Sequence, residues 1–266
     1  MSFAARSFAL LLFAADAYAQ RMQLELRPRV GDTLRMRLDQ VTEISGGRQG
    51  AAMKPVITTL RMFSRAIVQS SAPASALILA ITDSVDVSSN DEHARALTAE
   101  TERQLRGRQM RLRLSPDGTV GIAEQPDVPK EVNDLVSVMP GSFPRDPVSI
   151  GESWVREMPI ASGSAFGAPI GGVVRANFRL DSISRGGDLA FISMRGSVVP
   201  PSQVGGEQAM TGSIDGAIVV NRRRGWLSES RFEVEMNTTV PTLGESRAPA
   251  KFRTRITQRM RIFDRR

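Results

Sequence analysis

The sequence lacks most of the side chains from which enzymes build reactive sites. It has no cysteine and one histidine in 266 residues, which excludes disulfides, thiol nucleophiles and thiolate metal sites. A serine-histidine-aspartate triad would have to use His93, and no Gly-x-Ser-x-Gly elbow accompanies that residue. Asp83 and Asp86 stand three positions apart on a predicted strand, so we expect them on opposite faces, unable to share an ion. The sequence therefore predicts no catalytic, cofactor-binding or metal-binding residue and favours a non-catalytic role.

Long apolar runs are also missing, apart from one short run at the N-terminus. Residues 1–19 combine Arg6, the apolar stretch Ser7–Ala14 and the small-x-small sequence Ala17–Ala19. This pattern predicts a signal peptide cleaved before Gln20, and hence a periplasmic or secreted protein. The run is shorter than the roughly 20 residues that span a bilayer. We expect no transmembrane span.

The charge is unbalanced, with 35 Lys and Arg against 28 Asp and Glu, for a net charge of +7. Only Lys54, Lys130 and Lys251 are lysines. Such a charge would suit nucleic acid in a cytosolic protein, but the predicted export argues against a nucleic-acid partner. Solubility or contact with an acidic glycan or lipid headgroup suits an exported protein better.

Apolar and polar residues alternate along most of the chain. Val174, Ala176 and Phe178 interleave with Arg175 and Asn177, and residues 231–237 and 251–262 follow the same pattern. A period of two gives each strand one dry face and one wet face, which is typical of antiparallel sheets. Turn sequences such as 115–118, 185–188 and 223–225 separate these stretches. About ten antiparallel strands are predicted.

Two stretches have helical patterns instead. Residues 90–106 show i,i+4 charge pairs and end at Gly107, and residues 129–139 place Val132, Leu135, Val136 and Met139 on one face. The sequence predicts two short helices.

A weak internal repeat organises the chain. Val30–Leu34 recurs as Ile150–Trp154, and similar strands and turns follow in the same order. This predicts a first β unit over 20–142, which contains both helices, and a second over 143–266. Together they form a curved antiparallel sheet, half-barrel or flattened barrel. One barrel or two lobes both fit the pattern.

The stretch Phe143-Pro144-x-x-Pro147-Val148-x-Ile150-Gly151-Glu152-Ser153-Trp154 resembles a motif of an uncharacterised family of exported bacterial β-rich proteins. That resemblance implies export and a β-rich fold, and brings no activity or site residue. The expected architecture is also similar to the half-barrels of periplasmic lipoprotein carriers.

A large curved sheet must fill its concave face or accommodate something there. Our leading hypothesis is therefore a non-catalytic protein that binds a lipid or other apolar ligand inside the sheet, with no cofactor. The first alternative is an envelope scaffold for a protein or acidic glycan, which would use an arginine face near the C-terminus: Arg253, Arg255, Arg259 and Arg261. The second is a hydrolase built on two carboxylates. The oligomeric state stays open.

Overall fold

The structure is a computed structural model that describes residues 21–48, 51–123, 142–160, 172–199, 210–240 and 249–263. These residues form eleven antiparallel strands and one helix, which confirms the all-β prediction. The strands are β1 (Thr33–Arg48), β2 (Ala51–Ser71), β3 (Ala76–Ser89), β4 (Gln109–Leu114), β5 (Val120–Ile122), β6 (Ser153–Ile160), β7 (Gly172–Ile183), β8 (Leu189–Val199), β9 (Met210–Asn221), β10 (Trp226–Val240) and β11 (Ala250–Phe263).

All eleven strands belong to one sheet, in the order β5-β4-β3-β2-β1-β11-β10-β9-β8-β7-β6. Every neighbouring pair is consecutive in the chain except β1 and β11. These two run antiparallel in the middle of the sheet, in register from Arg35↔Phe263 to Gly47↔Lys251. The last strand thus joins the strands of the two predicted units. The edge strands β5 and β6 do not pair with each other, so the sheet is open and the flattened-barrel form of the prediction is wrong.

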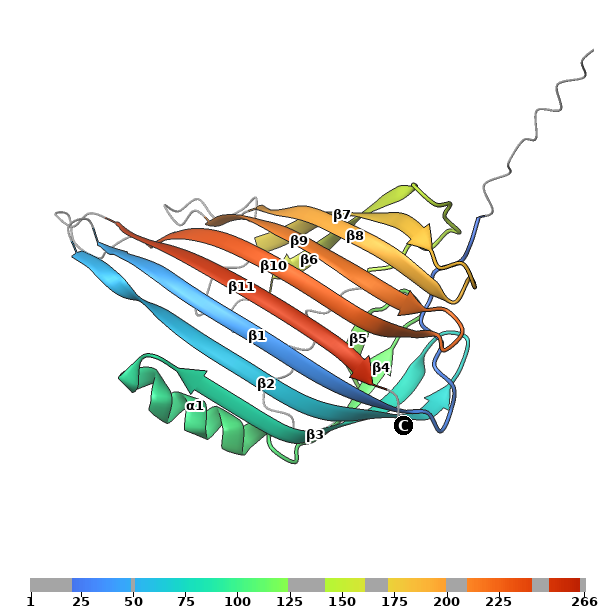
Figure 1. Cartoon of the computed structure of the whole chain (residues 1–266), viewed down its shortest axis with the longest axis horizontal. Helices are drawn as coiled ribbons and strands as arrows, with labels where there is room; N and C mark the ends of the chain where they lie inside the picture. The colour runs from blue at the N-terminus through green and yellow to red at the C-terminus, as the bar shows by residue number, and fades with distance from the viewer. Residues whose placement is uncertain are drawn as a thin grey trace, which may run out of the picture.

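The sheet curls, so that β4, β5 and β6 lie behind its long central strands in Figure 1. Glycines on the inner face help it to curl. A Cβ atom at Gly212 would lie 2.2 Å from the carbonyl oxygen of Glu235, and one at Gly216 would lie 2.4 Å from the ring of Phe232. Because no Cβ could occupy these points, glycine permits the close approach of β9 and β10.

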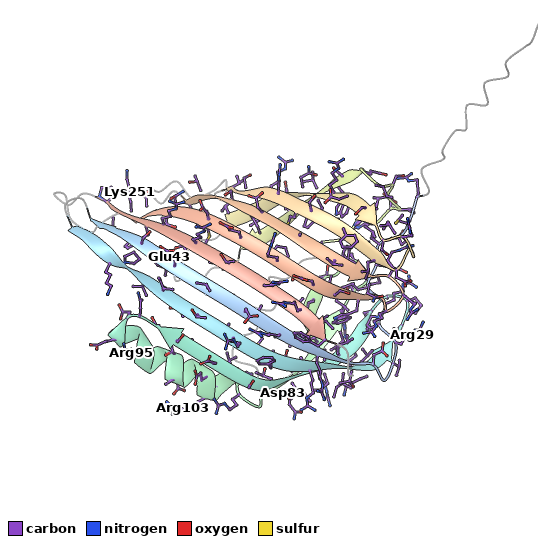
Figure 2. All side chains as sticks on the ribbon, viewed as in Figure 1. Arg29, Glu43, Asp83, Arg95, Arg103 and Lys251 are labelled. Carbon is purple, nitrogen blue, oxygen red and sulfur yellow. The ribbon has the colours of Figure 1, made fainter. Side chains whose placement is uncertain are left out.

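One helix, α1 (Glu92–Leu105), confirms the first helical prediction. It packs against β3 beyond the point where β4 stops pairing with that strand. The Glu102 carboxylate accepts a 2.6 Å hydrogen bond from the backbone N–H of Val87, a donor on the strand edge. Figure 2 shows Arg95 and Arg103 projecting from α1 away from the sheet. The helix thus covers an edge that would otherwise offer free pairing groups. The helix predicted at 129–139 lies outside the described residues.

The segment before β1 closes one end of the curled sheet. Its backbone donates hydrogen bonds from Leu26 to Pro116 in the β4–β5 turn and from Arg27 to Gly225 in the β9–β10 turn, both 2.8 Å long. Met22 and Val148 exchange two further bonds. Leu24 and Leu26 are 1% and 5% exposed and belong to the main core cluster. We call this the closed end.

The two turns that open the predicted units share one geometry. Gly31 and Gly151 have φ values of +86° and +88°. The backbone N–H of Gly31 donates to the carbonyl oxygen of Val68, and that of Gly151 donates to the carbonyl oxygen of Leu180. In return, the N–H of each strand residue donates to the carbonyl oxygen of the residue that follows the glycine. Left-handed backbone of this kind favours glycine. The matching bonds agree with a repeat, while the boundary between 20–142 and 143–266 stays a prediction.

The placement of Asp83 and Asp86 on opposite faces is wrong. The β2–β3 register shifts at this point, with Phe63 opposite Ser84 and Ser64 opposite Thr82. Asp83 is the extra residue of this β-bulge, which restores both aspartates to the outer face. There Asp83 forms an ion pair with Arg65, 2.8 Å away.

Candidate functional site

The inner face of the sheet is an apolar surface that extends across all the strands. Residues directly opposite in neighbouring strands point to the same side, so the register identifies this face from the core cluster. One cluster includes Leu114 of β4 and Phe178 of β7, which lie near opposite edges of the sheet. The curled sheet therefore packs its two flanks together around the closed end.

Burial is uneven along this inner face. On β7 and β8 the inner residues are packed, with Leu180 0% and Ile192 2% exposed. On β1 and β2 the inner residues beyond the closed end keep partial exposure, as do several on β10 and β11: Met36, Leu38, Ile44, Val56, Leu60, Met62, Phe232, Val234 and Met260. These apolar side chains are only partly covered by the chain itself. They form what we call the half-buried inner surface.

A single charge faces this apolar side. Among register-paired inner positions whose side chains the structure describes, only Arg156 of β6 is ionised. It stands opposite Ala176, which is fully buried, and two residues beyond Trp154. Its Nη2 donates a hydrogen bond to the carbonyl oxygen of Phe143, while its Nε is buried and has no hydrogen-bond partner in the described part of the chain. The sequence signal was present, as an arginine two positions from Trp154 and hence of the same parity, but the sequence prediction did not include it.

Trp154 lies beside this arginine on the inner face of β6. Its ring stacks on Phe178 at 5.9 Å between centroids and 11° between planes. The indole N–H donates a 2.7 Å hydrogen bond to the carbonyl oxygen of Ser142. Residues 142 and 143 are thus tied to β6 by both side chains, Trp154 and Arg156.

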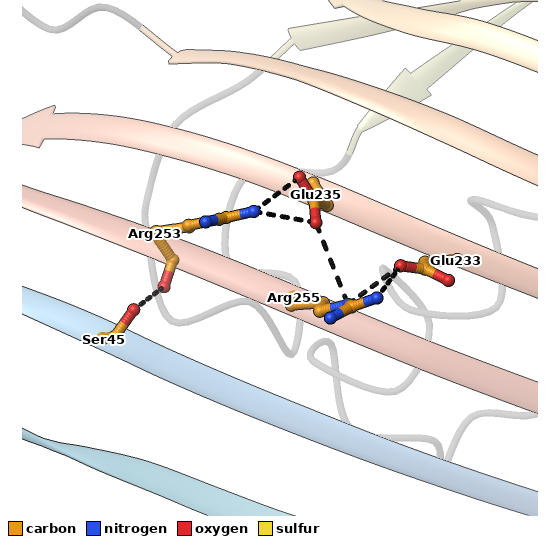
Figure 3. Close-up of polar contacts among 5 residues, drawn as sticks. All are labelled: Ser45, Glu233, Glu235, Arg253 and Arg255. Carbon is orange, nitrogen blue, oxygen red and sulfur yellow. Dashed lines mark hydrogen bonds and ion pairs between the residues drawn. The ribbon is translucent and has the colours of Figure 1, made fainter.

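The outer face carries many ion pairs, beside exposed apolar side chains such as Val41, Ile57 and Phe63. Arg253 contacts Glu235 at 2.9 Å, Arg259 contacts Glu229 at 2.7 Å, and Arg255 pairs with Glu233. Figure 3 shows the first and last of these pairs side by side on β10 and β11. The predicted arginine face therefore exists as a row on β11, with carboxylates of β10 beside three of its members.

The fourth predicted residue, Arg261, has a buried Nε for which the described ranges supply no hydrogen-bond partner. It lies between Arg37 and Glu229 in the register. Contact of any of these four arginines with a glycan or protein stays a prediction.

Two pKa shifts follow from this outer network. The hydrogen bond from Arg37 lowers the pKa of Asp39 below its ordinary value of 3.8, with Arg61 adding to the effect and burial opposing it. The hydrogen bond to Glu233 raises the pKa of Arg255, which stays charged at any working pH. Both shifts belong to surface ion pairs and mark no reactive group.

Two hollows lie at the closed end. The first has a volume of ≈ 530 Å³ and is lined by Arg29, Asp32, Thr33, Leu34, Arg223, Arg224 and Phe263. The second, of ≈ 420 Å³, lies between the N-terminal segment and the β4–β5 turn. The first lies between the start of β1, the end of β11 and the β9–β10 turn. Figure 2 shows Arg29 at this end of the molecule.

Three further features considered in the sequence are a metal site, His93 and a membrane-spanning segment. No group of three His, Asp or Glu residues in the described ranges is placed to hold a metal ion. His93 lies on α1, outside the side chains that the structure describes. Across the described residues, no helix is both long and apolar enough to cross a bilayer.

Comparisons with known proteins give a fold and no family. No protein-family model matches the chain. No curated protein sequence matches it either. Among solved structures, one that describes lipid–protein interactions in lipovitellin aligns with 89% of this chain at a TM-score of 0.52 and 8% identity. The sheet is similar to part of lipovitellin. The chain spans only 25% of the lipovitellin chain, and at this identity the likeness extends to the fold alone.

Two further structures align over most of the chain at low scores. DynF, from the dynemicin biosynthesis pathway of Micromonospora chersina, has a TM-score of 0.22 at 8% identity, covering 91% of this chain and 86% of its own. An outer membrane channel from Pseudomonas putida F1 has a TM-score of 0.23 at 11% identity, with coverages of 90% and 97%. Scores this low support no inference.

Proposed function

We propose that this protein is a non-catalytic, exported carrier that holds a lipid or other apolar ligand against the inner face of its curved sheet. The observation that carries the proposal is the half-buried inner surface. Apolar side chains that point to the inside of a sheet and yet stay partly exposed leave a hydrophobic surface unsatisfied. Covering it with an apolar ligand would gain about 25 cal/mol for each Å² removed from water.

The fold likeness supports the same function. The lipovitellin structure concerns lipid–protein interactions, and its similar part is a sheet of the same kind. Because a fold alone does not assign a function, this likeness adds to the argument from the inner surface and does not replace it.

The test compares charge insertion on the two faces of β2. Leu60 faces inward and Thr59 faces outward, one position away. We expect purified wild-type protein to enhance the fluorescence of an apolar probe, and gently purified protein to release lipid in native mass spectrometry. Leu60→Asp should abolish both signals, because a carboxylate in the apolar contact would have to be desolvated. Thr59→Asp should preserve both.

An equal loss in the two variants, or the absence of lipid and probe binding in the wild type, would remove the proposal. Export itself is tested separately, by N-terminal sequencing of protein recovered from the cell envelope or medium. A mature N-terminus at Gln20 is the expected result.

A further inference from the structure

The isolated charge on the inner face points to the kind of ligand. Arg156 stands on an edge strand, with its guanidinium against the apolar side of the sheet. Its guanidinium has five N–H donors. Within the described chain it makes one hydrogen bond, from Nη2 to the carbonyl oxygen of Phe143. The Nε is buried and has no acceptor among the residues that the structure describes. Buried donors of this kind are rare in folded proteins and costly, the more so on a charged group.

Holding the 142–143 segment does not account for this arginine. Trp154 already anchors that segment through its indole N–H, and one neutral donor would suffice for the Phe143 carbonyl. Among the described, register-paired inner positions no carboxylate accompanies Arg156; its strand neighbour Glu157 is on the outer side and pairs with Arg175 there. The charge therefore has no counter-ion among the described residues of the inner face.

The register shows what lies next to the guanidinium. Across the sheet, Arg156 is followed by Ala176, Gly196, Ile214 and Val234 on the inner face. The first two are the smallest side chains available, and Ile214 leans over Gly196. Ala176 is fully buried, whereas Gly196, Ile214 and Val234 keep partial exposure, so an apolar tail could contact this row from β8 onward. A charge at one end of an apolar row is the complement of an amphiphile.

The length of the row fits a lipid tail. Four steps between strands, at about 4.8 Å each, separate Arg156 from Val234, or roughly 19 Å. One acyl layer of a bilayer is about 15 Å thick, half of the hydrocarbon core. An acyl layer of this thickness, with its headgroup at Arg156, would span about three of the four steps and end near Ile214 on β9, one strand short of the half-buried inner surface on β10.

We propose that Arg156 is the headgroup site of the proposed carrier and selects anionic amphiphiles, with a carboxylate or phosphate oxygen accepting from Nε and a terminal nitrogen of the guanidinium. This inference rests on the proposed function, since it requires a tail bound on the inner face. Arginine suits the role because its planar fork matches both oxyanions.

The experiment uses three probes that share one sixteen-carbon tail: hexadecanoate, hexadecyl phosphate and hexadecanol. Their affinities are measured by displacement of a fluorescent fatty acid from purified wild-type protein, Arg156→Gln, Arg156→Lys and Arg175→Gln. Gln can still donate to the Phe143 carbonyl, and Arg175 is the matched outer-face control on the neighbouring strand. The readout is the ratio of anionic to neutral affinity within each preparation, which does not depend on the folded fraction.

We expect the wild type to bind at least one anionic probe about tenfold or more tightly than hexadecanol, as a charged hydrogen bond would give. Arg156→Gln should bring the ratio close to one with hexadecanol affinity unchanged, Arg156→Lys should keep part of the preference, and Arg175→Gln should keep all of it. The anionic probe that binds more tightly identifies the headgroup as carboxylate or phosphate.

Equal affinities for the three probes, or a preference that survives Arg156→Gln, would overturn the headgroup site and leave the apolar carrier standing. If none of the probes bound to the wild type, the carrier itself would fail, and this inference with it.

Discussion

The uneven burial of the inner face predicts that two chemically identical substitutions will have different costs. Leu180→Ala on β7 removes a fully buried side chain from the core cluster, and Leu38→Ala on β1 removes a partly exposed one from the half-buried inner surface. A buried Leu→Ala substitution costs about 2–5 kcal/mol, because a cavity adds to the lost transfer energy. For Leu38 we expect about 1 kcal/mol, since part of its surface already contacts water and its removal leaves no closed cavity.

A bound ligand should stabilise the two variants by different amounts. A ligand at one hundred times its Kd stabilises the folded protein by about 2.7 kcal/mol. If Leu38 contacts the ligand and Leu38→Ala weakens binding tenfold, this gain falls by about 1.4 kcal/mol, whereas Leu180→Ala leaves the gain unchanged. Urea denaturation with and without a bound apolar ligand measures both quantities. Equal costs for the two variants without ligand, together with equal ligand-induced gains, would refute the distinction between packed core and binding surface.

Three further predictions concern the fold and the outer face. Gly216→Ala should destabilise the protein by about 1–3 kcal/mol in urea denaturation, because its Cβ would overlap the ring of Phe232 and the carbonyl oxygen of Arg231; a wild-type midpoint would contradict the close approach. The lowered pKa of Asp39 contributes stability that is complete above about pH 4 and is lost as the pH falls through its folded-state pKa. Asp39→Asn should therefore flatten the acid limb of a stability–pH curve while changing stability at pH 7 by less than about 1 kcal/mol, and an unaltered acid limb would refute the assignment. Retention on heparin resin should survive simultaneous substitution by Ser of the three paired outer arginines, Arg253, Arg255 and Arg259, since carboxylates already partner them. Reduced retention would instead favour the scaffold alternative.

Alternation in the sequence was enough to predict the strands and the two faces, because a period of two translates directly into a wet side and a dry side. Phe232, Val234 and Met236 point inward as expected, and Glu233 and Glu235 lie beside the arginines of β11. Parity fails where a bulge adds a residue. The register shift beside Asp83 returned it to the face of Asp86, and nothing in the local sequence marks that extra residue.

The candidate site was harder to predict, because it depends on contacts between residues far apart in the chain. The alternation makes Arg156 inward-facing, but its meaning depends on a neighbouring strand with Ala176 and on a carbonyl from the segment before β6. Likewise, the sequence left open whether the arginine row near the C-terminus is a free cationic patch, and the register answers this by bringing β10 carboxylates beside three of its members.

The half-buried inner surface depends on the pairing of β1 with β11, the joint in the middle of the sheet. The half-buried inner surface lies on both sides of this joint, with Leu38 opposite Met62 on one side and Met260 on the other. Since β11 is the last described strand and β1 the first, this surface forms only when the two ends of the described chain pair. Removal of residues 250–266 would leave β1 and β10 with unpaired edges and an apolar face cut in two. We therefore expect that truncation to abolish probe binding and to cause aggregation in size-exclusion chromatography, while substitution of Phe263 alone, an exposed residue at the end of β11, should affect neither. A monomeric truncated protein that still bound the probe would place the ligand away from the central strands.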